Sequence, residues 1–300
     1  PGQGSQKIGM AKQIEDLPNT KERFSYASEI FERNLFEICE LNSESINPLD
    51  DLNNTRNTQI CLFLVESILL DALKANNFRP NYVAGHSLGE ITALYSADVF
   101  SFEDCVLLIK ERSKLMVNAG KGSMAAVIGF DRNQLDLLVQ KTDDIVIAND
   151  NSSSQVVLSG SHEALDNLSR EISCKRFIKL NVSGAFHSPF MNEPSAKLSE
   201  FLKNIKFKNP SCPVISNYEP SLCSDLNKLK IKFKNQMCNG VRWRETMDLM
   251  AKDSDLHIVE IGPSNVLSGL AKRHLKDVKI SQVSSSCLLY TSDAADDDHC

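Results

Sequence analysis

The chain lacks several features that would point to whole classes of protein. It has no run of about 18 apolar residues, so we expect no membrane span. Acidic residues outnumber basic ones, 39 to 33, and the net charge of −6 gives no electrostatic case for nucleic acid binding. Nine cysteines form no Cys-x-x-Cys pair and six histidines show no metal-type spacing, so neither a zinc site nor a disulfide framework is indicated. We therefore expect a soluble protein with no metal or cofactor, in a reducing compartment: the cytoplasm or an organelle matrix (plastid or mitochondrion).

The most informative stretch that is present is residues 85–89, which read Gly-His-Ser-Leu-Gly and match the pattern Gly-x-Ser-x-Gly. In that pattern a sharp turn between a strand and a helix lifts the serine above the edge of a sheet. The apolar run 82–84 predicts the strand, and 90–97 predicts the helix. Ser87 is then a candidate nucleophile, and the backbone N–H of Leu88 points at the oxygen of any carbonyl that the serine attacks. This is the apparatus of acyl transfer.

The order of predicted elements is typical of an α/β protein. Apolar residues at helical spacing predict a buried helix over 58–76 and another that begins near Ser101. Between 122 and 188 the order becomes strand, helix, two strands, helix, strand, which matches a small ferredoxin-like module. Its predicted strands are 124–128, 145–148, 155–158 and 177–182, and its predicted helices are 132–141 and 163–174.

We therefore predict two structural units and a tail. Residues 1–121 and 189–286 form a discontinuous α/β-hydrolase-like catalytic domain with a parallel sheet, in which 258–261 is a core strand. Residues 122–188 form the inserted ferredoxin-like subdomain. Composition shifts abruptly to Asp and Ala near the end, so we expect 287–300 to be disordered or foreign to the domain.

Two residues could work with Ser87. His187 lies in a loop between a predicted strand and a predicted helix start, where catalytic groups gather, although a lone loop histidine can equally be structural. Arg112 falls in the middle of the apolar stripe of the helix from Ser101. A buried guanidinium needs an anion, which is either a buried carboxylate of the protein or the carboxylate of a substrate. His86 points away from its neighbour Ser87 and is a poor candidate for the base.

The Gly-rich stretch 2–4 could be mistaken for a nucleotide-binding loop. Gly9 is too far along the chain for Gly-x-Gly-x-x-Gly, and Met10 stands where a Walker loop needs lysine. With a nucleophile elbow downstream, this backbone is better used as the second donor of an oxyanion hole.

Five motifs, in order, resemble those of one family, the malonyl-CoA:acyl carrier protein transacylases of type II fatty acid synthesis. The resemblance runs from Pro1 to about Val283. The motifs are 1–6 (Pro-Gly-Gln-Gly-Ser-Gln), 85–90 (Gly-His-Ser-Leu-Gly-Glu), 111–113 (Glu-Arg-Ser), 184–188 (Gly-Ala-Phe-His-Ser) and 262–267 (Gly-Pro-Ser-Asn-Val-Leu).

The resemblance implies a role for each candidate. Ser87 would be the nucleophile and His187 its base, Arg112 would bind the malonyl carboxylate, and the backbone N–H groups of Gln3 and Leu88 would form the oxyanion hole. The implied reaction moves a malonyl group from malonyl-CoA to the phosphopantetheine thiol of acyl carrier protein through a malonyl-serine, with ping-pong kinetics. The implied partners are these two substrates, and we expect a monomer.

Three further positions follow from the same resemblance. Asn149, in a predicted loop 149–151, is similar to a polar residue near the family's acyl pocket, but it could equally be an ordinary turn asparagine. Phe186, before His187, resembles the form that selects malonyl over α-methyl-branched groups. Arg242 stands where the family often has Gln, which puts any role there in doubt.

Two other functions fit the elbow. One is a serine hydrolase such as a thioesterase, for which a cation at Arg112 has no use when the acyl chain is neutral. The other is a catalytically silent module that binds carrier proteins, which would form no covalent adduct at Ser87.

One compact basic run, at Lys228, Lys230, Lys232 and Lys234, interrupts the acidic sequence. Its alternation fits a strand with one solvated face, but the apolar residues around it fit a helix equally well, and the resemblance implies a helix. The run is either a solvated face or a contact for the acidic surface of an acyl carrier protein.

Overall fold

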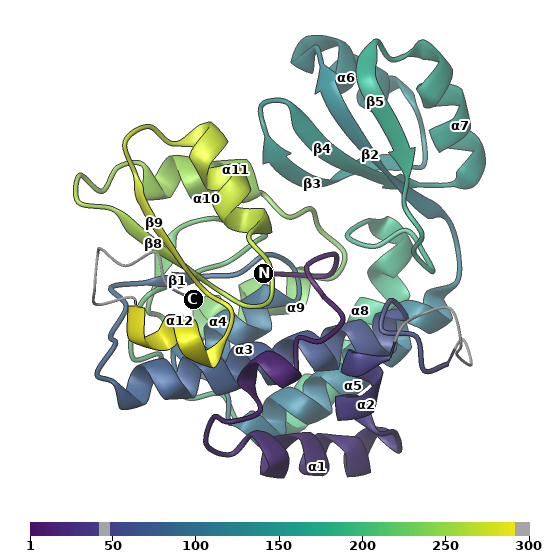
Figure 1. The fold of residues 1–300 in the computed structure, drawn as a ribbon. Coiled ribbons are helices and arrows are strands. Elements are labelled where there is room, and N and C mark those ends of the chain that lie inside the picture. The colour runs from purple at the N-terminus through teal and green to yellow at the C-terminus, as the bar shows by residue number, and fades with distance from the viewer. Residues whose placement is uncertain (42–48, 292–300) are drawn as a thin grey trace.

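The computed structural model describes residues 1–41 and 49–291, which form two bodies of mixed α/β structure (Figure 1). The predicted α/β class is thus confirmed. Among the described residues, every helix is too short or too polar to traverse a bilayer. The smaller body consists of β2 (Ser123–Phe130), α6 (Arg132–Lys141), β3 (Ile145–Ser152), β4 (Gln155–Gly160), α7 (His162–Glu171) and β5 (Cys174–Lys179).

The larger body contains the remaining elements. In chain order they are η1 (Lys12–Ile14), α1 (Thr20–Phe31), α2 (Leu35–Glu40), α3 (Thr55–Ala75), β1 (Val83–Ala84), α4 (Gly89–Ser96), α5 (Phe102–Ala119), η3 (Pro189–Met191), α8 (Asn192–Phe201), η4 (Leu202–Asn204), β6 (Val214–Ile215), β7 (Leu222–Cys223), α9 (Leu226–Asn235), α10 (Trp243–Met250), β8 (His257–Ile261), α11 (Val266–His274), β9 (Lys279–Val283) and α12 (Ser286–Thr291).

The long helix α3 lies at the centre of the larger body. Every residue from Thr58 to Leu70 is buried, because apolar side chains continue round the helix in its middle. Helix α5 packs along it, and its first turn is capped as the sequence predicts: the Ser101 Oγ accepts a hydrogen bond of 3.1 Å from the Asp104 N–H. The buried helix predicted over 58–76 is confirmed and begins three residues earlier.

The smaller body is a four-stranded antiparallel sheet in the order β3-β4-β2-β5, with α6 and α7 on its outer side (Figure 1). It has its own apolar core, formed around β2, β4 and α7. One expectation is wrong: 149–151 is not a loop, because β3 continues through Ser152. The strand is irregular there, with register shifts after Ile147 and after Asp150, and pairing with β4 overrides the turn preference of the asparagines.

The strands of the larger body bring two distant segments together at the elbow. β1 pairs with β6 in parallel, with Val83 opposite Val214 and Ala84 opposite Ile215. Because parallel strands end at the same edge, the residues that follow β6 lie beside the residues that follow β1. β7 pairs with β6, and β8 pairs in parallel with β9 in a separate sheet.

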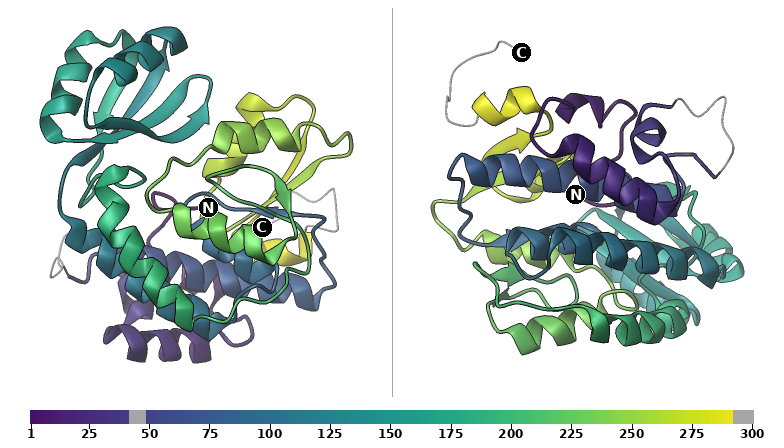
Figure 2. Two further views of the ribbon diagram at one scale, coloured as in Figure 1. Left: turned by 180° about the vertical axis from the view of Figure 1, so that it is seen from behind. Right: turned by 90° about the horizontal axis from the view of Figure 1, so that it is seen from below.

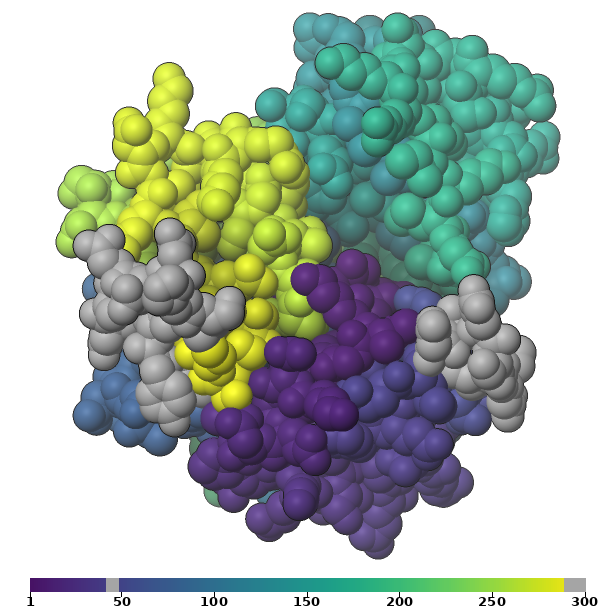
Figure 3. Space-filling view, in the orientation of Figure 1, coloured from purple at the N-terminus to yellow at the C-terminus, as the bar shows by residue number. Residues whose placement is uncertain are grey.

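The two bodies are joined along the outer edge of β3. Asn149 forms a parallel bridge with Val241 of the larger body; the Asp150 N–H donates to the Val241 carbonyl at 2.9 Å, and the Val241 N–H donates to the Ala148 carbonyl at 2.7 Å. The Asp150 carboxylate accepts from Arg244 of α10 at 3.0 Å. The space-filling view shows the smaller body in contact with the C-terminal part of the larger body (Figure 3).

The C-terminal segment differs from expectation in its first residues. The expected disordered or foreign tail begins at 287, whereas α12 runs over Ser286–Thr291 and lies against α3 and β9 (Figure 2). Residues 292–300 of that expectation lie outside the described part of the chain.

Candidate active site

Ser87 lies in a sharp turn between β1 and α4, which is the predicted order of strand, elbow and helix. Its φ of 54° is in the left-handed region, which costs a residue with a side chain about 1–3 kcal/mol. The turn needs glycine at Gly85, because a Cβ there would lie 1.8 Å from the Gly89 carbonyl oxygen. The tightness of the turn therefore lifts the serine hydroxyl away from its neighbours.

His187 meets Ser87 across 100 residues of sequence. Its Nε2 lies 2.7 Å from the Ser87 Oγ, and its Nδ1 lies 3.0 Å from the Gln236 carbonyl and 3.2 Å from the Asn239 carbonyl. Carbonyls only accept, so Nδ1 carries the proton and Nε2 is free to accept the serine proton. Burial, and then the Arg112 charge, lower the His187 pKa to about 3, so the ring is a neutral base at physiological pH.

Arg112 lies on α5 with its side chain 1% exposed. Its guanidinium donates to the Gln59 Oε1 at 2.6 Å, the Gln236 Oε1 at 3.2 Å and the Ser87 Oγ at 3.3 Å, while its Nε has no partner. In the described part of the chain no carboxylate forms a salt bridge with it. Burial lowers its pKa to about 10, so it stays charged at neutral pH. The sequence left open whether Arg112 binds a carboxylate of the protein or one of a substrate. Among the described residues, no protein carboxylate is in contact with it.

Two glutamines that the sequence analysis missed hold this cluster together. Gln236 contacts all three groups: its side-chain amide donates to the Ser87 carbonyl at 2.6 Å, its Oε1 accepts from Arg112, and its backbone carbonyl accepts from His187. Gln59 is a polar residue on the all-round buried part of α3, and that position is a signal that could have found it. Gln236 follows α9 and has no comparable signal.

Asn217 also escaped the sequence analysis. It follows β6, is 2% exposed, and its side chain contacts the elbow on both sides of His86. Its Nδ2 donates to the Gly85 carbonyl and its Oδ1 accepts from the Ser87 N–H, each at 2.6 Å. Its own N–H donates to the Glu90 carboxylate at 3.3 Å, and burial raises the pKa of that carboxyl to about 7.

The expected oxyanion donors, the N–H groups of Gln3 and Leu88, have no hydrogen-bond acceptor among the described residues. Gln3 follows Gly2, which packs so closely on the elbow that a Cβ would lie 2.5 Å from the His86 carbonyl oxygen. The Gln3 side chain is held separately, by a 3.2 Å hydrogen bond to the Thr55 Oγ1. Both N–H groups therefore remain free to donate to a ligand.

A family model described as an acyl transferase domain matches residues 1–294. The chain belongs to this family. Among its curated relatives, the malonyl CoA-acyl carrier protein transacylase of Synechocystis sp. is 40% identical over 283 residues, which are 94% of each chain. The Bacillus subtilis protein of the same name is 36% identical over 296 residues, with 94% of this chain and 92% of that protein covered.

Solved structures of similar proteins agree with this acyl transferase domain over nearly its whole length. The crystal structure of the Synechocystis malonyl-CoA:ACP transacylase matches with a TM-score of 0.92 at 40% identity, covering 97% of both chains. A malonyl-transacylase in complex with its type II PKS acyl-carrier protein matches with a TM-score of 0.88 at 30% identity, covering 97% of this chain and 96% of that one.

The remaining expected site residues of the acyl transferase domain, Asn149 and Phe186, make no side-chain hydrogen bond to Ser87, His187 or Arg112 among the described residues. Asn149 lies in β3 at the seam between the bodies, and its Oδ1 is buried without a partner. Phe186 is buried in the core of the larger body beside His187. His86 is held by the Asn151 amide oxygen at 2.9 Å, and burial lowers its pKa to about 4, which fits the structural role expected of it.

The lysine run of the acyl transferase domain lies on α9, a helix as the resemblance implied. It does not form one basic patch, because the Lys232 side chain is buried and donates to the Glu219 carbonyl at 2.7 Å. Lys230 lies over the Phe207 ring, 5.3 Å from its centroid. Only Lys228 and Lys234 of the run are exposed.

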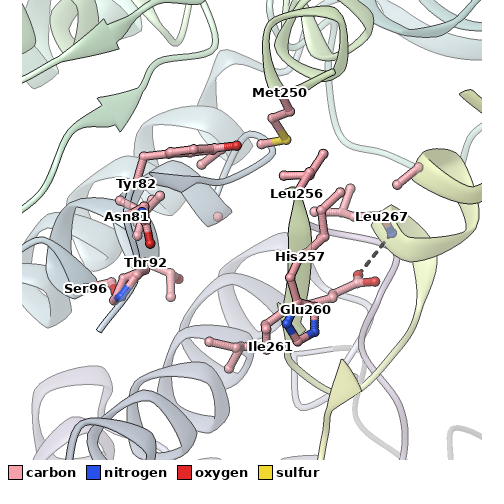
Figure 4. A pocket seen from close by; sticks show the side chains of 18 of the residues that line it. Asn81, Tyr82, Thr92, Ser96, Met250, Leu256, His257, Glu260, Ile261 and Leu267 are labelled. Atoms are coloured by element: carbon pink, nitrogen blue, oxygen red, sulfur yellow. Dashed lines mark hydrogen bonds between the residues drawn. The ribbon is translucent and has the colours of Figure 1, made fainter. Parts of the chain in front are cut away.

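A cavity of about 430 Å³ lies between β1 and β8, and Ala84 and Gly89, on either side of the elbow, are among its lining residues (Figure 4). Apolar side chains such as Leu256 form much of its lining, and Ser87 is not among the lining residues. Glu260 lies in the lining near α11. Its carboxylate accepts a 3.0 Å hydrogen bond from the Leu267 N–H at the start of that helix and so has a structural partner. This cavity therefore does not contain the candidate nucleophile.

Proposed function

We propose that this acyl transferase domain moves a malonyl group from malonyl-CoA to the phosphopantetheine thiol of an acyl carrier protein. The observation that carries the proposal is Arg112, a buried cation 3.3 Å from the Ser87 Oγ with no carboxylate in contact among the described residues. Glu90 is close enough to interact electrostatically with Arg112 but forms no salt bridge with it, and a buried cation without a carboxylate in contact favours binding of an anion next to the serine. The carboxylate of a malonyl ester on Ser87 meets that need.

The first half-reaction loads the serine. His187 takes the Ser87 proton at Nε2 as Oγ attacks the thioester carbonyl of malonyl-CoA. The N–H groups of Gln3 and Leu88 stabilise the oxyanion. The tetrahedral intermediate then breaks its C–S bond, the CoA thiolate takes the proton from His187, and malonyl-Ser87 remains.

The second half-reaction is the reverse with a different thiol. The phosphopantetheine thiol gives its proton to His187 and attacks the malonyl ester; the C–O bond breaks, and Ser87 recovers the proton. Arg112 holds the carboxylate throughout, and Asn149 and Phe186 shape the acyl pocket. Because CoA leaves before the carrier protein binds, the kinetics are ping-pong.

The proposal extends to architecture. The larger body, residues 1–121 and 189–286, is an α/β-hydrolase-like domain, an assignment supported by the elbow after β1 and the parallel pairs β1–β6 and β8–β9. Residues 122–188 are a ferredoxin-like subdomain, supported by the strand order β3-β4-β2-β5 with two helices on one side. The domain acts as a monomer in the cytoplasm or an organelle matrix.

The two rival functions fit the site less well. A hydrolase of neutral acyl chains would leave the Arg112 guanidinium without a carboxylate in contact. A silent carrier-binding module would have no use for a neutral imidazole 2.7 Å from a serine hydroxyl. The 40% identity to a malonyl CoA-acyl carrier protein transacylase supports transfer over both.

Labelling with radioactive malonyl-CoA tests the proposal. The expected result is one covalent adduct per chain, absent in Ser87→Ala, that is stable in buffer and discharged on addition of holo carrier protein. No adduct in folded protein would support the silent module. Rapid loss of the adduct to water without carrier would support the hydrolase.

A further inference from the structure

The backbone of the elbow must be held against its own strain. Ser87 has a φ of 54°, and relaxation of that angle would rotate the hydroxyl away from the His187 Nε2, which is 2.7 Å distant. The two peptide groups that define the turn are the Gly85 carbonyl and the Ser87 N–H. Both point away from the helix ladder of α4 and need partners from elsewhere.

One side chain supplies both partners. The Asn217 Nδ2 donates to the Gly85 carbonyl and the Asn217 Oδ1 accepts from the Ser87 N–H, each at 2.6 Å. A planar amide is suited to this because it presents a donor and an acceptor side by side, whereas a carboxylate presents only acceptors. Asn217 is itself fixed, since its N–H donates to Glu90 and its carbonyl accepts from the Arg242 N–H at 3.0 Å.

The same bridge affects which backbone N–H groups are available to stabilise an oxyanion. The Ser87 N–H is occupied by Asn217, whereas the Leu88 N–H, the next along the chain, has no acceptor among the described residues. Asn217 thus fixes the orientation of the peptide group between His86 and Ser87, and with it the position of the Ser87 Cα.

We propose that Asn217 is a positioning residue for the nucleophile, which aligns Ser87 with His187 through its paired hydrogen bonds to Gly85 and Ser87. The proposal deepens the proposed function and rests on it for the natural substrate. Alignment of the serine can also be measured without that substrate, because a fluorophosphonate probe reacts with any base-activated serine.

Asn217→Asp and Asn217→Leu are the test variants, both close to asparagine in size. We expect each to lower the rate of fluorophosphonate labelling of Ser87 and kcat for malonyl transfer by about a hundredfold, the effect of a misplacement of about 1 Å. KM for malonyl-CoA should change little, because Arg112 is untouched. Asn57→Asp is the matched control: Asn57 is also buried and its side-chain amide also holds two backbone groups, since its Nδ2 donates to the Leu49 and Asp51 carbonyls at 2.8 and 2.9 Å, away from the elbow.

The pH dependence separates alignment from general destabilisation. A protonated aspartate regains a donor for the Gly85 carbonyl, so labelling of Asn217→Asp relative to wild type should rise as the pH falls. The His187 base does not obscure this rise, since burial lowers its pKa to about 3. Glu90, which accepts from the Asn217 N–H and whose pKa burial raises to about 7, titrates in wild type as well, which is why the ratio to wild type is the quantity measured. A ratio that is flat with pH overturns the donor role.

Labelling of both Asn217 variants at the rate of Asn57→Asp, with thermal melting confirming that all three are folded, overturns the proposal. If Asn217→Leu does not fold, the pH-dependent ratio of Asn217→Asp still decides. If wild type reacts with fluorophosphonate but not with malonyl-CoA, the proposed function fails while the positioning role is still tested by the probe.

Discussion

Replacing Arg112 by methionine should abolish the preference for an acid-terminated acyl group while leaving the serine reactive. Methionine fills much of the same volume without charge, so the buried site is not left with a large void. Arg112→Met removes the cation that lies 3.3 Å from the Ser87 Oγ. What changes is therefore the interaction between that cation and the malonyl carboxylate.

The size of the effect follows from the burial of the guanidinium, which is 1% exposed. Two unit charges about 4 Å apart at an effective dielectric constant of about 20 attract by about 4 kcal/mol. That corresponds to a loss of about a thousandfold in kcat/KM for malonyl-CoA. The assay compares this loss with the rate for acetyl-CoA, or for a neutral fluorophosphonate, on the same preparations.

The comparison with a neutral substrate isolates the charge. Arg112→Met also deprives the Gln59 and Gln236 side chains of a donor, and any resulting shift of the site affects both substrates equally. We expect the neutral substrate to lose no more than a few-fold. Equal losses for malonyl-CoA and the neutral substrate would refute the reasoning, because Arg112 would then act only in holding the site together.

Four further predictions concern the base, the pH dependence of stability, the elbow and the carrier. Burial lowers the His187 pKa to about 3, so the rate of Ser87 acylation should stay level from about pH 8 to pH 5; a decline centred near 6.5 would contradict this assignment. The unfolded chain likewise binds the protons of His187 and His86 more readily, and Glu90, whose pKa burial raises to about 7, offsets this only in part, so the free energy of unfolding, measured in urea, should fall as the pH drops below about 6.5. Gly85→Ala should prevent the turn, since its Cβ would lie 1.8 Å from a carbonyl oxygen, and activity should be lost even in preparations that circular dichroism shows to be folded. Lys228→Glu with Lys234→Glu should raise KM for carrier protein at low salt and not at high salt; an unchanged KM at low salt would exclude α9 as a contact.

The sequence allowed prediction of those parts of the site that have a local pattern. The elbow could be located because a strand, a tight Gly-flanked turn and a helix are all short-range features around Ser87. Arg112 stood out because a cation interrupted an apolar stripe. The neutral state of His187 could not be predicted, because it depends on burial and on the Arg112 charge, which only the folded chain brings near.

The parts that failed depend on contacts between distant segments. Asn149 lies in a strand because β4 and Val241 pair with both edges of β3, and turn propensity does not anticipate that. Lys232 is buried because its ammonium reaches the Glu219 carbonyl and the Ser221 Oγ in the segment before α9. Asn217 reaches the elbow only because β6 lies beside β1.

The backbone hydrogen bonds between β3 and Val241 limit how the two bodies can move. Two backbone hydrogen bonds and the salt bridge between Asp150 and Arg244 would have to break before the smaller body could move away from α10. His86, the residue just before Ser87, is hydrogen-bonded to Asn151 of β3, so such a movement would also displace the elbow. We therefore expect the two bodies to keep their relative position during the reaction rather than to close around a bound substrate.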